Sequence, residues 1–91
     1  MNIKDYCVEI FNLLISVRED SWSKEFASII NGFEDFEKST LLHRIGKIYA
    51  GMGSFSDLVL YKDGALCFEE NEKLDELRKR LFEELKEIAR Q

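Results

Sequence analysis

The chain has 91 residues, a formal net charge of −5, 45% hydrophobic residues and no proline. This apolar content argues against disorder, and the length fits a single domain spanning residues 1–91. The 13 basic residues gather in no basic patch, which argues against direct binding of nucleic acid. No segment has the roughly 20 apolar residues needed to cross a bilayer, and none has the pattern of a signal peptide. We therefore expect a cytoplasmic protein.

Three amphipathic helices are predicted in the first half of the chain. Apolar residues recur at intervals of three and four over residues 4–17, 22–33 and 41–49, the spacing of one buried helix face. The second helix should stop near Gly32, and the acidic stretch 34–38 is expected to be a connector. The expected N-terminal caps are Asp20 or Ser21 for the second helix and Ser39 or Thr40 for the third.

The segment after the third helix is the least helix-like part of the chain. Gly51 and Gly53 indicate a backbone corner where side chains would be in the way. The apolar run 58–61, the tight-turn sequence Lys-Asp-Gly at 62–64 and the returning run 65–68 then predict a β-hairpin.

A long final helix is predicted beyond the hairpin. Apolar residues from Leu74 to Ile88 lie on one side, and Asn71 is the expected N-cap. The sequence therefore predicts a mostly helical α+β protein with three N-terminal helices, a β-hairpin and a long C-terminal helix.

The glycine corner is the first candidate site, formed by Gly51, Gly53, Ser54 and Asp57. Backbone N–H groups in such a corner can bind anions. Phosphate loops, however, place a helix start or a lysine directly after the glycines, and here a strand is expected. We expect a structural corner in which Asp57 bonds to the turn backbone; a ligand or partner contact is the alternative.

Cysteine and histidine show no pattern that carries chemistry. Cys7, Cys67 and His43 lack the close spacing of metal ligands, and no nucleophile motif accompanies the histidine. We expect no metal, no cofactor and no enzymatic activity. Both cysteines should be buried free thiols, with a disulfide as the alternative, and the histidine should be exposed or half-buried.

Acidic side chains supply the second candidate site, a surface that contacts a basic partner. The candidates are Glu34, Asp35 and Glu37 in the connector and Glu69, Glu70 and Glu72 before the last helix. The alternative for the second group is a solvated helix start.

The run Gly-Met-Gly-Ser-Phe-Ser-Asp at 51–57, with the acidic helix start after it, resembles a small bacterial domain family of unknown function. That family's signature usually reads Gly-Met-Gly-Ser-Phe-Asn-Asp, so Ser56 stands where asparagine is usual. Trp22, ahead of the second helix, is similar as well. In size, charge and style the chain also resembles the immunity proteins of contact-dependent inhibition and polymorphic toxin systems.

This resemblance implies a non-catalytic inhibitor that binds a cognate toxin domain and covers its active site or an adjacent surface, with a basic nuclease as one candidate. The alternative function is an adaptor that binds a host protein or small ligand through the glycine corner and hairpin. Monomer and homodimer both stay open, since a hairpin has free edges.

Overall fold

The computed structural model describes residues 2–35, 37–49 and 54–89. In chain order its elements are α1 (Ile3–Ser16), α2 (Asp20–Asp35), α3 (Lys38–Lys47), the 3-10 helix η1 (Phe55–Asp57), β1 (Tyr61–Lys62), β2 (Ala65–Leu66) and α4 (Phe68–Ala89). The predicted fold class is confirmed: three helices, a hairpin and a long C-terminal helix.

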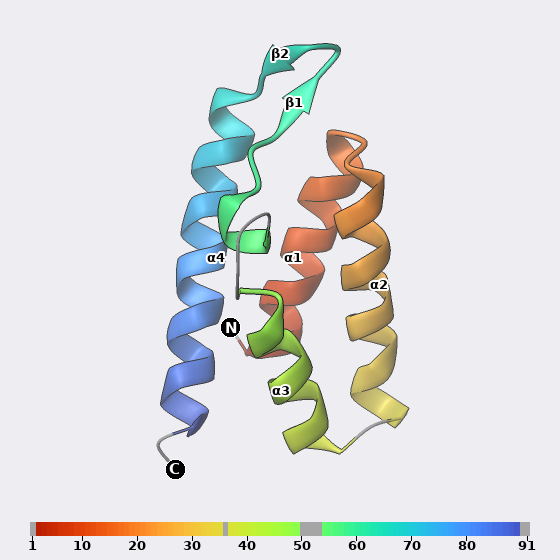
Figure 1. Ribbon diagram of the computed structural model, residues 1–91, viewed down its shortest axis with the longest axis vertical. Helices are drawn as coiled ribbons and strands as arrows, with labels where there is room; N and C mark the ends of the chain where they lie inside the picture. Colours follow the sequence, from red (N-terminus) through yellow and green to blue (C-terminus); the bar gives the residue numbers. More distant parts are fainter. Residues whose placement is uncertain (1, 36, 50–53, 90–91) are drawn as a thin grey trace.

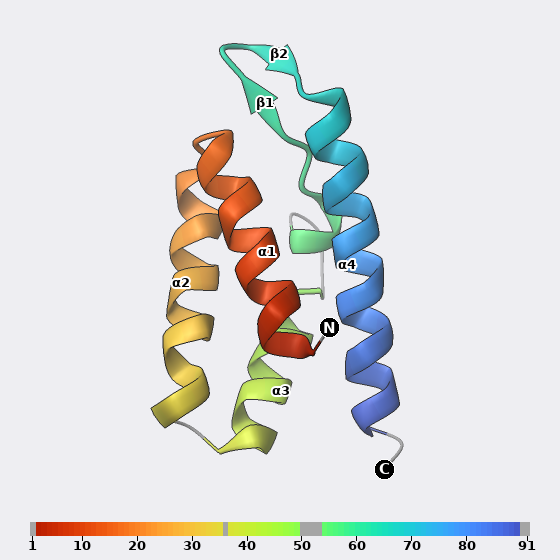
Figure 2. The same ribbon diagram turned by 180° about the vertical axis from the view of Figure 1, so that it is seen from behind.

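Three helices run side by side along the 41 Å length of the molecule, with α1 between α2 and α4 (Figures 1 and 2). The short helix α3 lies near one end, and the hairpin projects at the opposite end. In the part of the chain that the structure describes, no helix has the length and apolar character needed to cross a membrane.

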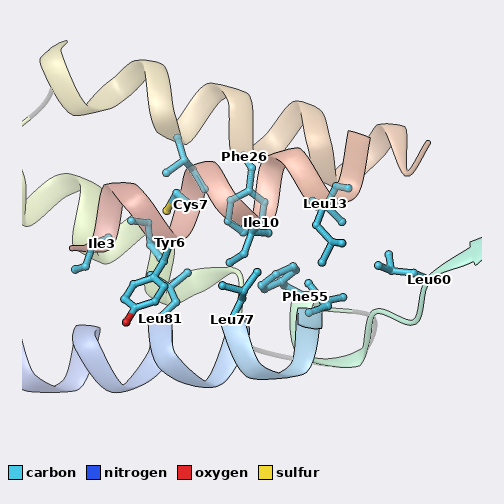
Figure 3. Close-up of a cluster of buried hydrophobic side chains, with 14 of the residues drawn as sticks. Ile3, Tyr6, Cys7, Ile10, Leu13, Phe26, Phe55, Leu60, Leu77 and Leu81 are labelled. Carbon is cyan, nitrogen blue, oxygen red and sulfur yellow. The ribbon is translucent and has the colours of Figure 1, made fainter. Parts of the chain in front are cut away.

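The core is built around α1, whose apolar stripe faces both neighbouring helices (Figure 3). At its centre lies the fully buried ring of Phe55, which comes from η1 rather than from a long helix. Its centroid is 4.9 Å from the ring of Phe26, 5.4 Å from Trp22 and 5.7 Å from Tyr49. Burying one such ring stabilises a fold by about 2–3 kcal/mol, so η1 is part of the core.

Helix α2 differs from the prediction at both ends. It begins at Asp20, and the carboxylate of Glu19 accepts a hydrogen bond from the Trp22 amide at 2.8 Å, so Glu19 takes the capping role expected of Asp20 or Ser21. Its other end continues past Gly32 to Asp35. Gly32 is buried, and Phe33 packs against the core, so tertiary packing outweighs the local stop signal.

Helix α3 also starts earlier than predicted. Its N-cap is Glu37, which makes no side-chain capping hydrogen bond, and Ser39 and Thr40 lie inside the helix. The predicted connector over 34–38 is therefore wrong for most of its length, because Glu34 and Asp35 belong to α2 and Lys38 to α3.

The hairpin forms where it was predicted but with shorter strands. Lys62 pairs with Ala65 and Tyr61 with Leu66. Asp63 and Gly64 between them have φ values of 54° and 81°, the two positive values of a type I′ turn, whose twist matches that of the strands.

Candidate functional site

The described part of the glycine corner is tied to the rest of the molecule by backbone groups. The Phe55 amide donates to the carbonyl of Ile48 at 2.9 Å, and the Ser56 hydroxyl donates to the carbonyl of Tyr49 at 3.1 Å. Ser54 is buried and caps η1 by accepting from the Ser56 amide. Ser54 thus has the structural role expected of the corner.

Asp57 is the last residue of η1 and is exposed, as is Ser56. The Asp57 amide donates to the carbonyl of Ser54 at 3.0 Å. Gly51 and Gly53 lie outside the described residues.

Arg78 of α4 holds the corner from the other side. Its guanidinium donates to the carbonyls of Phe55 and Leu58, both at 2.8 Å, lies over the Phe55 ring and pairs with the carboxylate of Asp75. The side chain is only 13% exposed. Sequence reasoning missed this residue, because a basic residue on a charged helix normally faces solvent and nothing local marks it.

The hydroxyl of Tyr49 extends the same network. It donates to the carbonyl of Arg78 at 2.9 Å. Burial is the main reason that the pKa of Tyr49 is raised, so the hydroxyl keeps its proton at neutral pH and remains a donor.

Asn71 fastens the hairpin to α4. Its side-chain amide accepts from the Leu60 amide at 2.8 Å and donates to the carbonyls of Leu60 and Cys67 at 3.0 and 2.7 Å. The prediction that Asn71 is the N-cap of the last helix is wrong, because α4 already begins at Phe68. Asn71 instead bonds to the backbone of Leu60 where the strand ladder ends.

The outer face of the hairpin is apolar and exposed. Tyr61 and Leu66 are directly paired, so their side chains share one face, and alternation places Val59 on that face as well. Phe68, the first residue of α4, follows Leu66 by two positions and is 74% exposed, against 58% for Tyr61. Leu60 is fully buried. We use the name hairpin face for Val59, Tyr61 and Leu66 together with Phe68, which follows them at the start of α4.

Sequence reasoning located the hairpin but not this face. The signal was present, since residues on opposite sides of a two-residue turn pair in a fixed register. This register shows which side chains share a face, but which face is exposed became clear only from the burial of Leu60.

The six candidate carboxylates fall into two groups at opposite ends of the molecule (Figure 1). At the α3 end lie Glu34, Asp35 and Glu37; at the hairpin end, in the first turns of α4, lie Glu69, Glu70 and Glu72. All are exposed except Glu70, which is half-buried. The structure therefore does not bring the six together on one small surface.

Ion pairing distinguishes the six from four other acids of the chain. Glu9, Glu25, Asp75 and Glu76 each pair with a lysine or arginine. Within residues 2–35, 37–49 and 54–89, none of the six forms such a pair. Their charge is thus not neutralised by a described neighbour.

An open hollow of about 590 Å³ lies at the α3 end. Apolar side chains such as Phe33 and Leu41 line it together with two lysines and two glutamates, Lys4, Lys38, Glu34 and Glu84. The balanced charges give this hollow no preference for an anion or a cation.

The two cysteines and the histidine are the remaining residues that could carry chemistry. Both thiols are free. Cys7 is fully buried, and burial raises the pKa of its thiol to about 12, which keeps it protonated and unreactive. Cys67 is only half-buried, and His43 is exposed on α3. Among the described residues no group of His, Cys, Asp and Glu could hold a metal ion.

Comparison with known proteins identifies the family. The model of a domain of unknown function, DUF6966, matches residues 15–67. The chain belongs to the DUF6966 family. The DUF6966 match spans α2, α3, the corner and the hairpin, and it leaves α4 outside. No curated protein and no solved structure matches the chain. The Gly-Met-Gly-Ser-Phe-Asn-Asp signature and the relationship to immunity proteins stay predictions.

Proposed function

We propose that this DUF6966 protein is an immunity protein that binds a cognate bacterial toxin domain and blocks it by covering its active site or an adjacent surface. The observation that carries the proposal is the hairpin face, an exposed apolar surface beside the carboxylates of Glu69 and Glu72. Apolar surface gathered at one end of a small protein is typical of a protein-binding site.

The charge of the chain supports a basic toxin. A net charge of −5 attracts a cationic partner such as a nuclease and speeds its association. Glu69, Glu70 and Glu72 adjoin the hairpin face and are proposed to touch the toxin. Glu34, Asp35 and Glu37 at the other end then act through long-range attraction alone.

The alternative function is an adaptor that binds a host protein or small ligand. The sequence predicts that this adaptor would bind through both the glycine corner and the hairpin. The bonds of Ser54 and Ser56 within the molecule favour the hairpin as its contact surface, so the two functions differ mainly in the partner.

A growth assay tests the proposal. The protein encoded beside this chain is expressed alone, with the wild-type chain, and with a variant carrying Glu69→Lys and Glu72→Lys. We expect toxicity alone, normal growth with the wild type, and slower, more salt-sensitive association of the variant with the purified toxin. Reversal of Glu34 and Glu37 is the matched control and should change association less. Failure of the wild-type chain to restore growth, or a stoichiometric host protein as its partner, would overturn the immunity function.

A further inference from the structure

We infer that the hairpin face docks onto a protein surface that is apolar at its centre and bordered by lysine and arginine, with Phe68 as the side chain buried most on binding. This inference rests on the proposed function for the toxin as partner, but it concerns the chemistry of the contact. Of the two ends of the molecule that carry candidate carboxylates, the hairpin end is the one that contacts the partner.

The geometry of the hairpin supports one contiguous contact. Tyr61 and Leu66 lie opposite each other on one face of the hairpin, Val59 precedes Tyr61 by two positions, and Phe68 follows Leu66 by two positions at the start of α4. Aromatic residues with few rotatable bonds contribute most to tight interfaces. Phe68 and Tyr61 are the two most exposed large apolar side chains of the described chain, so they have the most surface to bury.

The hairpin is held in place before any partner arrives. Asn71 fixes Leu60 to α4, and Arg78 fixes the carbonyl of Leu58 at 2.8 Å. The turn is closed by Asp63 and Gly64 in the left-handed conformations it requires. A surface ordered in this way loses little conformational entropy on binding.

Charge selects the partner. Residues 59–72 contain one lysine, Lys62, against four acids, Asp63, Glu69, Glu70 and Glu72. A second copy of this chain, seated face to face, would place like charges close together, and such contacts are costly. Anionic lipid or nucleic acid would be repelled for the same reason. A protein surface with basic residues around an apolar centre complements both features.

A defined probe tests the contact without the toxin. The probe is a short amphipathic peptide of leucine and lysine, and its matched control has glutamate in place of every lysine. Each is titrated into the ¹⁵N-labelled full-length chain while backbone amide signals are followed. We expect the lysine peptide to shift the signals of residues 59–72 selectively and the glutamate peptide to leave them unchanged.

Variants make the result quantitative. Phe68→Ser should weaken binding of the lysine peptide by about tenfold or more, the effect expected of an interface anchor. Ile15→Ser is the control, because Ile15 is an exposed apolar residue of α1 outside the hairpin face, and it should change binding little. Both substitutions lie at exposed positions, and thermal unfolding verifies that each variant is folded.

Three outcomes would overturn the inference: shifts centred on the α3 end near Glu34 and Glu37, equal binding of both peptides, or a dimer of the free chain in sedimentation that Phe68→Ser dissociates. The growth assay separates this inference from the proposed function. Selective peptide binding without toxin neutralisation refutes immunity and leaves the contact chemistry standing. Neutralisation that survives Phe68→Ser refutes the contact and leaves immunity standing.

Discussion

Arg78 joins the last helix to the centre of the core. A buried carbonyl without a donor costs about 1–3 kcal/mol, and Arg78 supplies donors to two carbonyls, those of Phe55 and Leu58. Phe55 in turn contacts three aromatic rings. One side chain on α4 therefore stabilises both the corner and the ring cluster beneath it.

Replacing Arg78 by alanine should lower the free energy of unfolding by about 2–3 kcal/mol. The Leu58 carbonyl loses the guanidinium donor, and the Phe55 carbonyl keeps the longer bond from the Leu58 amide at 3.3 Å but loses the one from Arg78. Urea denaturation measures the change. Arg80→Ala is the matched control, since Arg80 pairs with Glu76 on the helix surface, and exposed pairs of this kind contribute little. Equal stability of the two variants would show that the corner does not depend on Arg78.

Single residues were also where sequence reasoning succeeded least. Asn71 was predicted to cap the last helix, but it lies inside α4 and accepts from the amide of Leu60, eleven residues away in the chain. Arg78 gave no signal at all. Contacts between segments distant in sequence cannot be inferred from local pattern.

The hairpin and α3 each contain a glycine, and the two differ in backbone conformation. Gly64 closes the turn at a φ of 81°, a conformation that side chains with a Cβ rarely adopt, whereas Gly46 lies exposed in α3. An ideal Cβ at either position would meet no atom of the described part of the chain within 4 Å. Backbone conformation alone therefore decides what alanine does at each.

Gly64→Ala should destabilise the protein by about 1 kcal/mol, because L-residues are strained in the left-handed region. Gly46→Ala should instead stabilise it by about 0.5–1 kcal/mol, because alanine is the better helix former. Thermal unfolding of both variants measures the two changes. Shifts of the same sign would contradict the assignment of the turn.

At the scale of elements, the number and order of helices followed from hydrophobic spacing, and the turn at 62–64 from its residue types. The ends of the elements did not. Helix α2 passes through Gly32 to Asp35 because its last turns have core to pack against. The strands are short because Cys67 leads directly into α4.

The whole molecule depends on helices that flank the matched family region. Residues 15–67 contain almost none of α1 and none of α4. These two helices nevertheless supply most of the fully buried aliphatic side chains, among them Ile10, Leu14, Leu74 and Leu81. The folded unit in this chain is therefore larger than the segment matched by the family model.

Stability of the whole molecule should fall as pH rises from about 9 towards 12. Burial raises the pKa of the Cys7 thiol from its ordinary value of 9.0 to about 12, and that of Tyr49 is raised as well. The folded protein holds these protons more tightly than the unfolded chain. Their stabilisation is therefore complete below pH 9 and is lost as pH rises through the folded-state values, at about 1.4 kcal/mol per pH unit for each group.

Urea denaturation of the wild type and of Cys7→Ala at about pH 8 and about pH 10.5 measures this effect. The variant lacks one of the two raised groups, so its stability should fall less between the two pH values. An equal fall in both proteins would mean that the thiol does not contribute. Other groups that titrate in this pH range change the stability of both proteins equally, so their contribution cancels when the two falls are compared.

The sequence by itself determined the kind of molecule: apolar spacing defined four helices, and Asp63-Gly64 defined a hairpin, because both signals act over a few neighbouring residues. Only the tertiary structure decided what each surface does. It separated the six candidate carboxylates into two ends, packed Arg78 against the buried Phe55, and left Tyr61 and Phe68 exposed. Those outcomes depend on which distant segments pack against each other, and one-dimensional spacing does not encode that.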